Sequence, residues 1–128
     1  MAVLDEGHLI RNAGSQVSIG CRGIRAKRRV VLSGTPVQNS VMDLWSVFDF
    51  LLPGLLGSEK QFHSEYRKPV QASRSKRADA QDLSGARVAL SRLHSVCLPF
   101  VLRRLKQDVM PELPPKIIQD IMVDMQPP

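Results

Sequence analysis

Two polar stretches decide the fold: Asp5-Glu6-Gly7-His8 and Ser33-Gly34-Thr35-Pro36-Val37-Gln38-Asn39. Each follows a short apolar run, Ala2 to Leu4 before the first and Val30 to Leu32 before the second. A buried parallel strand reads as an apolar run, and polar side chains at its carboxyl end are typical of a functional site. Open α/β sheets bind their ligands at that edge. The pattern therefore predicts an α/β fold with a parallel sheet and a site where these two strands end.

The adjacent carboxylates Asp5 and Glu6 indicate nucleotide hydrolysis. One carboxylate can hold Mg²⁺, usually through water, while its neighbour orients or deprotonates the attacking water. A plainer interpretation is an acidic pair at a helix N-terminus, where the helix dipole favours negative charge. The second stretch also has a plain interpretation, because Ser-Gly-Thr-Pro makes a good turn and Asn39 or Ser40 a good helix cap.

The sequence resembles a known family along nearly its whole length. Asp5-Glu6-Gly7-His8 resembles motif II (Walker B) of superfamily-two helicase-like ATPases, and residues 33–39 resemble motif III of their SWI/SNF branch. RNA helicases usually carry Ser-Ala-Thr in motif III, so Gly34-Thr35-Pro36 disfavours an RNA helicase lobe. Residues 43–51, 102–109 and 113–116 resemble later blocks of the branch, in the family's order. Residues 52–59, 68–74 and 113–120 resemble the group of these ATPases that acts on TATA-binding protein.

The resemblance implies a RecA-like motor lobe, present as its C-terminal half, with a helical protrusion. Residues 1–58 would form the half-lobe, residues 59–110 the protrusion and linker helix, and residues 111–128 a proline-rich crossing toward a second lobe. An incomplete domain is expected, since no Gly-x-x-x-x-Gly-Lys-Ser/Thr loop occurs to cradle phosphates. The full-length protein would be a nuclear, DNA-dependent ATPase, while the chain alone would be inactive.

The resemblance also assigns roles to residues. Asp5 and Glu6 would be catalytic, with Asp5 holding Mg²⁺ through water beside ATP. His8, Ser33, Thr35 and Gln38 would couple nucleotide state to DNA. Arg103 and Arg104 are candidates for inter-lobe or DNA contacts, although a solvated basic face explains them equally well. Duplex DNA and TATA-binding protein are the implied partners. The alternative function is a non-catalytic interaction module, or a degenerate fragment that no longer binds nucleotide.

Composition is compatible with this interpretation. The 128 residues include 18 Lys and Arg against 12 Asp and Glu, a net charge of +6. A basic domain suits nucleic acid, but charge alone does not establish binding. Cys21 and Cys97 lack paired spacing, which indicates reduced thiols, and the scattered histidines make a zinc site unexpected. The sequence shows neither a bilayer-spanning stretch nor a signal peptide.

Periodicity predicts the helices. A helix is expected over residues 15–26, with Val17, Cys21 and Ile24 facing inward. A second helix is expected over residues 40–52, with Ser40 as its N-cap and Asp43 as the acid of a capping box. Trp45 and Phe48 are expected in the core rather than stacked on bases. Further helices are expected over 59–67, 83–97 and 98–109, with an exposed loop over 71–82 and a strand over 117–125. The inward residues of the 83–97 helix are expected to be Leu83, Leu90, Leu93 and Cys97.

Overall fold

The computed structural model describes residues 1–34, 40–75, 77–110, 112, 114 and 117–121. The chain forms two compact units, Met1–Leu98 and Pro99–Pro128, and each is described by itself. The predicted boundaries at residues 58 and 110 stay predictions. In the part of the chain that the structure describes, no helix combines the length and the apolar character needed to cross a membrane.

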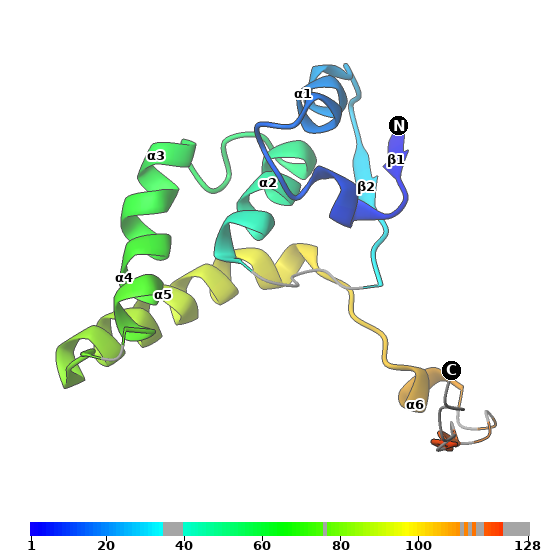
Figure 1. Cartoon of the computed structure of the whole chain (residues 1–128). Helices are drawn as coiled ribbons and strands as arrows, with labels where there is room; N and C mark the ends of the chain where they lie inside the picture. Colours follow the sequence, from blue (N-terminus) through cyan, green and yellow to red (C-terminus); the bar gives the residue numbers. More distant parts are fainter. Residues whose placement is uncertain (35–39, 76, 111, 113, 115–116, 122–128) are drawn as a thin grey trace, which may run out of the picture. The chain divides into compact units, whose positions relative to one another are not determined.

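Two parallel strands form the sheet of the first unit. Strand β1 (Ala2–Leu4) pairs with β2 (Arg29–Val31), and Val3 lies opposite Val30. Helix α1 (Gln16–Gly23) lies between them in the chain, which gives the β-α-β order seen in Figure 1. This confirms the parallel α/β prediction, with β2 beginning one residue earlier than its apolar run.

Helix α1 corrects one expectation about its inward face. Ser15 caps the helix as predicted, its side chain accepting the Ser18 backbone N–H at 3.2 Å. Val17 and Ile24 are 56% and 47% exposed, whereas Ser18 is the buried residue of the helix. The predicted apolar stripe is wrong because α1 packs its small polar side against backbone carbonyls of the preceding loop.

Helix α2 (Val41–Leu51) forms as predicted. The Ser40 side chain accepts the Met42 N–H at 3.1 Å. Trp45 and Phe48 are buried, which confirms their place in the core. Trp45 also donates its indole N–H to the carbonyl of Gly57 at 3.1 Å, so its polar edge is satisfied. Asp43 lies in the first turn, but the cap is the simple Ser40 cap rather than a capping box.

A helical arm continues from residue 59. Helix α3 (Glu59–Phe62), the π-helix η2 (His63–Arg67) and α4 (Lys68–Ser73) follow one another, and α4 packs along α5 (Ala80–Cys97). The rings of Phe62 and Tyr66 lie 4.8 Å apart, as their one-turn spacing suggests. The main core joins the arm to α2 and contains Trp45, Phe48, Phe62, Tyr66, Ala89, Leu93 and Cys97.

The arm also corrects two expectations. The predicted 71–82 loop is helical at both ends, since α4 runs to Ser73 and an Asp79 capping box starts α5 at Ala80. Leu83 and Leu90 are 50% and 44% exposed, and Ala86 and Ala89 are buried instead. Helix α5 therefore turns Ala86 and Ala89 inward, where it contacts α4 and η2, and leaves Leu83 and Leu90 on the surface. Leu93 and Cys97 point inward as predicted, and burial raises the pKa of Cys97 to about 11, so its thiol stays protonated.

The second unit has little regular structure. The predicted 98–109 helix is wrong: a 3-10 turn η3 (Leu98–Phe100) and α6 (Lys106–Val109) are separated by irregular chain. The apolar side chains of this stretch stay exposed, Leu102 by 86%, so no packing offsets the entropy of ordering a helix. Residues 117–121 are also irregular, while the rest of the predicted 117–125 strand lies outside the described residues.

Candidate functional site at the ends of the parallel strands

Asp5 and Glu6 form a strained turn directly after β1. Glu6 has φ 54° and ψ 55°, a left-handed conformation that is uncommon for a residue with a side chain. The Asp5 carboxylate accepts the Glu6 backbone N–H at 2.8 Å, which stabilises the turn. Strain of this kind costs on the order of 1–3 kcal/mol and is concentrated at functional sites. Both carboxylate side chains are exposed where the strand ends.

Gly7 brings the two polar stretches together. Its N–H donates to the carbonyl of Leu32 at 2.9 Å, and the Leu32 N–H donates to Leu4 at 2.8 Å. A Cβ on Gly7 would lie 2.3 Å from Val31 Cγ1 and 3.6 Å from the Ser33 Cβ. Glycine is therefore required here by the close approach of β2, not by its own φ. Ser33 lies beside Gly7, so the stretches that follow β1 and β2 meet at one edge of the sheet.

His8 contacts Glu6 directly. It lies in the 3-10 helix η1 (Gly7–Ile10), and its Nδ1 is 3.0 Å from Glu6 Oε2. Both side chains are partly exposed, at 39% for His8 and 61% for Glu6. The sequence placed His8 in the site through its motif, but the contact with Glu6 itself was not expected.

The other predicted site residues are not all gathered here. Thr35 and Gln38 lie outside the residues that the structure describes. Arg103 and Arg104 belong to the second unit and are exposed, with Arg104 donating to the Arg103 carbonyl at 3.2 Å. Their contacts with another lobe or with DNA stay a prediction.

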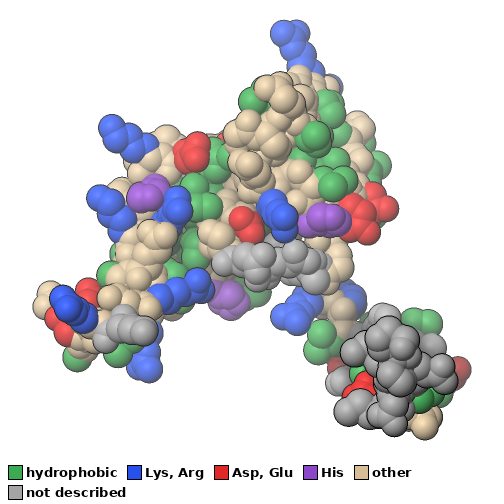
Figure 2. Space-filling view, viewed as in Figure 1, with side chains coloured by type: hydrophobic (Ala, Val, Ile, Leu, Met, Phe, Trp, Pro, Cys, Tyr) green, Lys and Arg blue, Asp and Glu red, His purple; other side chains and the backbone are tan. Residues whose placement is uncertain are grey.

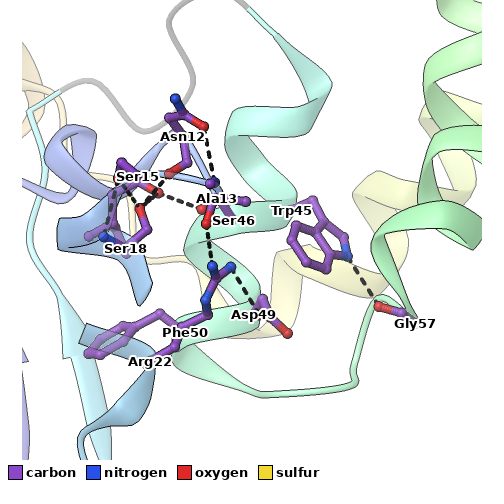
Figure 3. A network of polar contacts seen from close by, with 12 residues as sticks. Asn12, Ala13, Ser15, Ser18, Arg22, Trp45, Ser46, Asp49, Phe50 and Gly57 are labelled. Atoms are coloured by element: carbon purple, nitrogen blue, oxygen red, sulfur yellow. Dashed lines mark hydrogen bonds and ion pairs between the residues drawn. The ribbon is translucent and has the colours of Figure 1, made fainter. Parts of the chain in front are cut away.

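A polar network that the sequence did not reveal joins the loop after η1 to the helices α1 and α2 (Figure 3). The Ser18 hydroxyl lies 3.0 Å from the carbonyl oxygen of Ile10 and 2.6 Å from that of Asn12, and Ser46 donates to the same Ile10 carbonyl. Arg22 donates to the Ala13 carbonyl, and its Nη1 lies 3.4 Å from Asp49 Oδ2. The loop after η1 is thereby fastened to both α1 and α2.

Comparison with known proteins decides the family. The SNF2-related domain matches residues 1–128. The chain belongs to the SNF2-related domain family. It is 49% identical over 123 residues to TATA-binding protein-associated factor MOT1 of Saccharomyces cerevisiae, covering 96% of this chain and 7% of that protein. It is 48% identical over 125 residues to human TATA-binding protein-associated factor 172, covering 98% of this chain and 7% of that protein.

Solved structures agree with the SNF2-related fold. The Sulfolobus solfataricus SWI2/SNF2 ATPase core in complex with dsDNA superimposes with a TM-score of 0.68 at 34% identity. The match covers 84% of this chain and 20% of that one. The chain therefore corresponds to a small part of the relatives that it matches, and the parallel strands with their helices are an ATPase-core substructure.

The polar network links the two motifs of this SNF2-related chain. The Ile10–Ala13 segment follows motif II, and α2 follows motif III directly in the sequence. The Ile10 carbonyl lies within hydrogen-bond distance of the Ser18 hydroxyl on α1 and the Ser46 hydroxyl on α2. These contacts hold the loop after motif II against the helix that follows motif III. Ser18 and Ser46 sit among apolar helix residues, and each is only 1% exposed. A serine between two apolar residues, Val17 and Ile19 for Ser18 and Trp45 and Val47 for Ser46, was the available signal, although helical periodicity predicts a surface position for a serine.

Replacing both serines should cost more than the sum of the single changes. With Ser18→Ala or Ser46→Ala alone, one serine hydroxyl stays within hydrogen-bond distance of the Ile10 carbonyl, and we expect a loss of about 1 kcal/mol each. Ser18→Ala/Ser46→Ala leaves that buried carbonyl without either donor, which adds about 1–3 kcal/mol. Urea denaturation of the four proteins measures the coupling. Additive single effects would show that the carbonyl does not depend on the two hydroxyls.

Proposed function

We propose that this chain is part of the first motor lobe of a nuclear, ATP-dependent DNA translocase that remodels complexes of TATA-binding protein. The observation that supports the proposal best is the position of Asp5 and Glu6. They follow β1 at the sheet edge where motif II and motif III are joined through Gly7 and Leu32. Similarity to an ATPase core solved with dsDNA and to TATA-binding protein-associated factors supports the proposed reaction and partners.

The residues divide into two roles. Asp5 would hold Mg²⁺ through water, and Glu6 would orient the attacking water and accept its proton. His8, in contact with Glu6, couples that carboxylate to Ser33, Thr35 and Gln38 of motif III, so that hydrolysis responds to DNA. The left-handed backbone at Glu6 supports such an assignment, because strain of this kind is concentrated at functional sites.

The donor set fits ATP with Mg²⁺. Among the described residues no group of three or more His, Cys, Asp or Glu is close enough to cage a metal. Mg²⁺ binds through one or two carboxylates, several waters and the substrate phosphates, so Asp5 with its neighbour is a suitable partial shell. When bound, the ion would neutralise charge on the phosphates. The phosphate-binding loop and an arginine finger have to come from outside these 128 residues.

The second candidate is a non-catalytic interaction module, which the missing phosphate loop favours for this chain alone. A chimaera separates the two candidates: residues 1–128 replace the matching segment of yeast MOT1, and ATP hydrolysis is measured with and without duplex DNA. The motor proposal expects hydrolysis that DNA stimulates, with unaltered MOT1 measured in parallel. A folded, DNA-binding chimaera that does not hydrolyse ATP would support the interaction module instead.

His8→Ala in the same chimaera should separate coupling from chemistry. Basal hydrolysis should change little, because Asp5 and Glu6 remain, whereas stimulation by DNA should fall by about tenfold, a typical coupling loss. His8→Gln is the matched control, because its amide can still donate a hydrogen bond to Glu6. Equal losses of basal and stimulated rates in His8→Ala would place His8 in the chemical step and contradict the coupling role.

A further inference from the structure

The outer face of α5 has a composition that the motor motifs do not explain. Residues at helical spacing of three and four form it: Ser84, Arg87, Val88, Ser91, Arg92 and Ser95. All six are exposed, and they lie opposite the buried stripe of Ala86, Ala89, Leu93 and Cys97. Lys and Arg side chains project from the surface of this arm in Figure 2. We call these six residues the α5 outer face.

The charge on this face is uncompensated. From Leu83 to Leu98 the sequence contains no Asp or Glu. Within the residues that the structure describes, the ion pairs are His8 with Glu6 and Arg22 with Asp49, so neither Arg87 nor Arg92 has a carboxylate partner. The surface over this face is open, and Arg87, Val88, Ser91, Arg92 and Ser95 border it. Two guanidinium groups therefore border an open surface with hydroxyls between them.

The spacing of the two arginines indicates a ligand with several anionic groups. Arg87 and Arg92 are five residues apart, which corresponds to about 7.5 Å along the helix axis and roughly 140° around it. Side chains that leave a helix in such different directions suit two separate anionic groups better than one small anion. They suit two anions on either flank of the helix, with the serine hydroxyls in between. Arginine and serine side chains are common donors to the phosphates of nucleic acids.

We propose that the α5 outer face binds the phosphate backbone of duplex DNA. Among polyanions, duplex DNA is favoured over an acidic peptide, because the face has no row of side-chain pockets that would fix a peptide's register. The helical arm that contains α5, residues 59–97, carries eight Lys and Arg against four Asp and Glu. Because Arg87 and Arg92 leave the helix on different flanks, they suit backbone phosphates rather than one base edge, and we expect little dependence on base sequence. The choice of DNA rests on the proposed function, but the contact needs no ATP.

Fluorescence anisotropy with the 128-residue chain and a labelled duplex tests the proposal. Arg87→Ala/Arg92→Ala should weaken binding about tenfold near 50 mM salt, and the slope of log K against log salt should fall by about two, one for each lost phosphate contact. Two duplexes of unrelated sequence should bind alike. Arg74→Ala/Arg77→Ala is the matched control, since it removes the same charge from the loop before α5, and circular dichroism verifies folding of every variant.

Three results would overturn the proposal: no DNA binding by the unaltered chain, equal weakening by the two arginine pairs, or binding of poly-glutamate as tight as that of DNA. The second result would indicate only general charge attraction, and the third an acidic protein partner. Arg87→Lys/Arg92→Lys should bind better than the alanine variant, because the charge remains. Since no ATP is present, a failure here is distinct from a failure of the motor assignment.

Discussion

Glu6→Gln should lower DNA-stimulated ATP hydrolysis of the MOT1 chimaera by about 10²–10⁴-fold, the usual contribution of a general base. The amide keeps the shape of the side chain but cannot accept a proton from water. Binding of ATP with Mg²⁺ should persist, because Asp5 still serves the metal. Glu6 also keeps its strained backbone turn, since the Asp5 carboxylate that accepts its N–H is unchanged. The measurements are steady-state phosphate release and nucleotide affinity.

Asp5→Asn is the control that separates metal binding from proton transfer. It should weaken nucleotide affinity in the presence of Mg²⁺ more than Glu6→Gln does, because it alters the residue assigned to the metal. A Glu6→Gln chimaera that turns over at nearly the unaltered rate would show that Asp5 and Glu6 are not the hydrolytic pair. The central assignment would then fail, whatever the family of the chain.

Phe62→Ala should destabilise the first unit by about 3–5 kcal/mol, the usual cost of deleting a fully buried ring. Phe62 is 0% exposed and lies in the core where the arm meets α2, with Tyr66 4.8 Å away between ring centroids. The loss approaches the whole stability of a small domain, about 5–15 kcal/mol. Urea denaturation monitored by Trp45 fluorescence measures the effect, because Trp45 belongs to the same cluster.

Two comparison variants keep that prediction testable even if Phe62→Ala fails to fold. Phe62→Leu retains most of the apolar volume and should cost about 1–2 kcal/mol. Leu102→Ala removes a side chain that is 86% exposed and should change stability by less than about 0.5 kcal/mol. Similar midpoints for Phe62→Leu, Leu102→Ala and the unaltered chain would contradict a core that depends on Phe62.

The sequence by itself determined the features that depend on local patterns. The apolar runs before residues 5 and 33 predicted two parallel strands whose polar ends meet, and the hydrogen bond between Gly7 and Leu32 confirms that meeting. Ser40 and the aromatic spacing of Trp45 and Phe48 predicted α2 and its buried face. These predictions succeeded because helix caps and apolar periodicity depend on residues that are close together in the sequence. The order of the family motifs along the chain indicated the family.

Long-range packing decided the rest. Ser18 and Ser46 are buried because backbone carbonyls of the Ile10–Ala13 loop need hydrogen-bond donors. The residues next to each serine in the sequence give no sign of this need. Ala86 and Ala89, rather than Leu83 and Leu90, lie on the inner face of α5, because packing against α4 and η2 decides which side of the helix faces inward. The 98–109 segment has an amphipathic pattern but forms little helix, since an apolar stripe stabilises a helix only when another surface covers it.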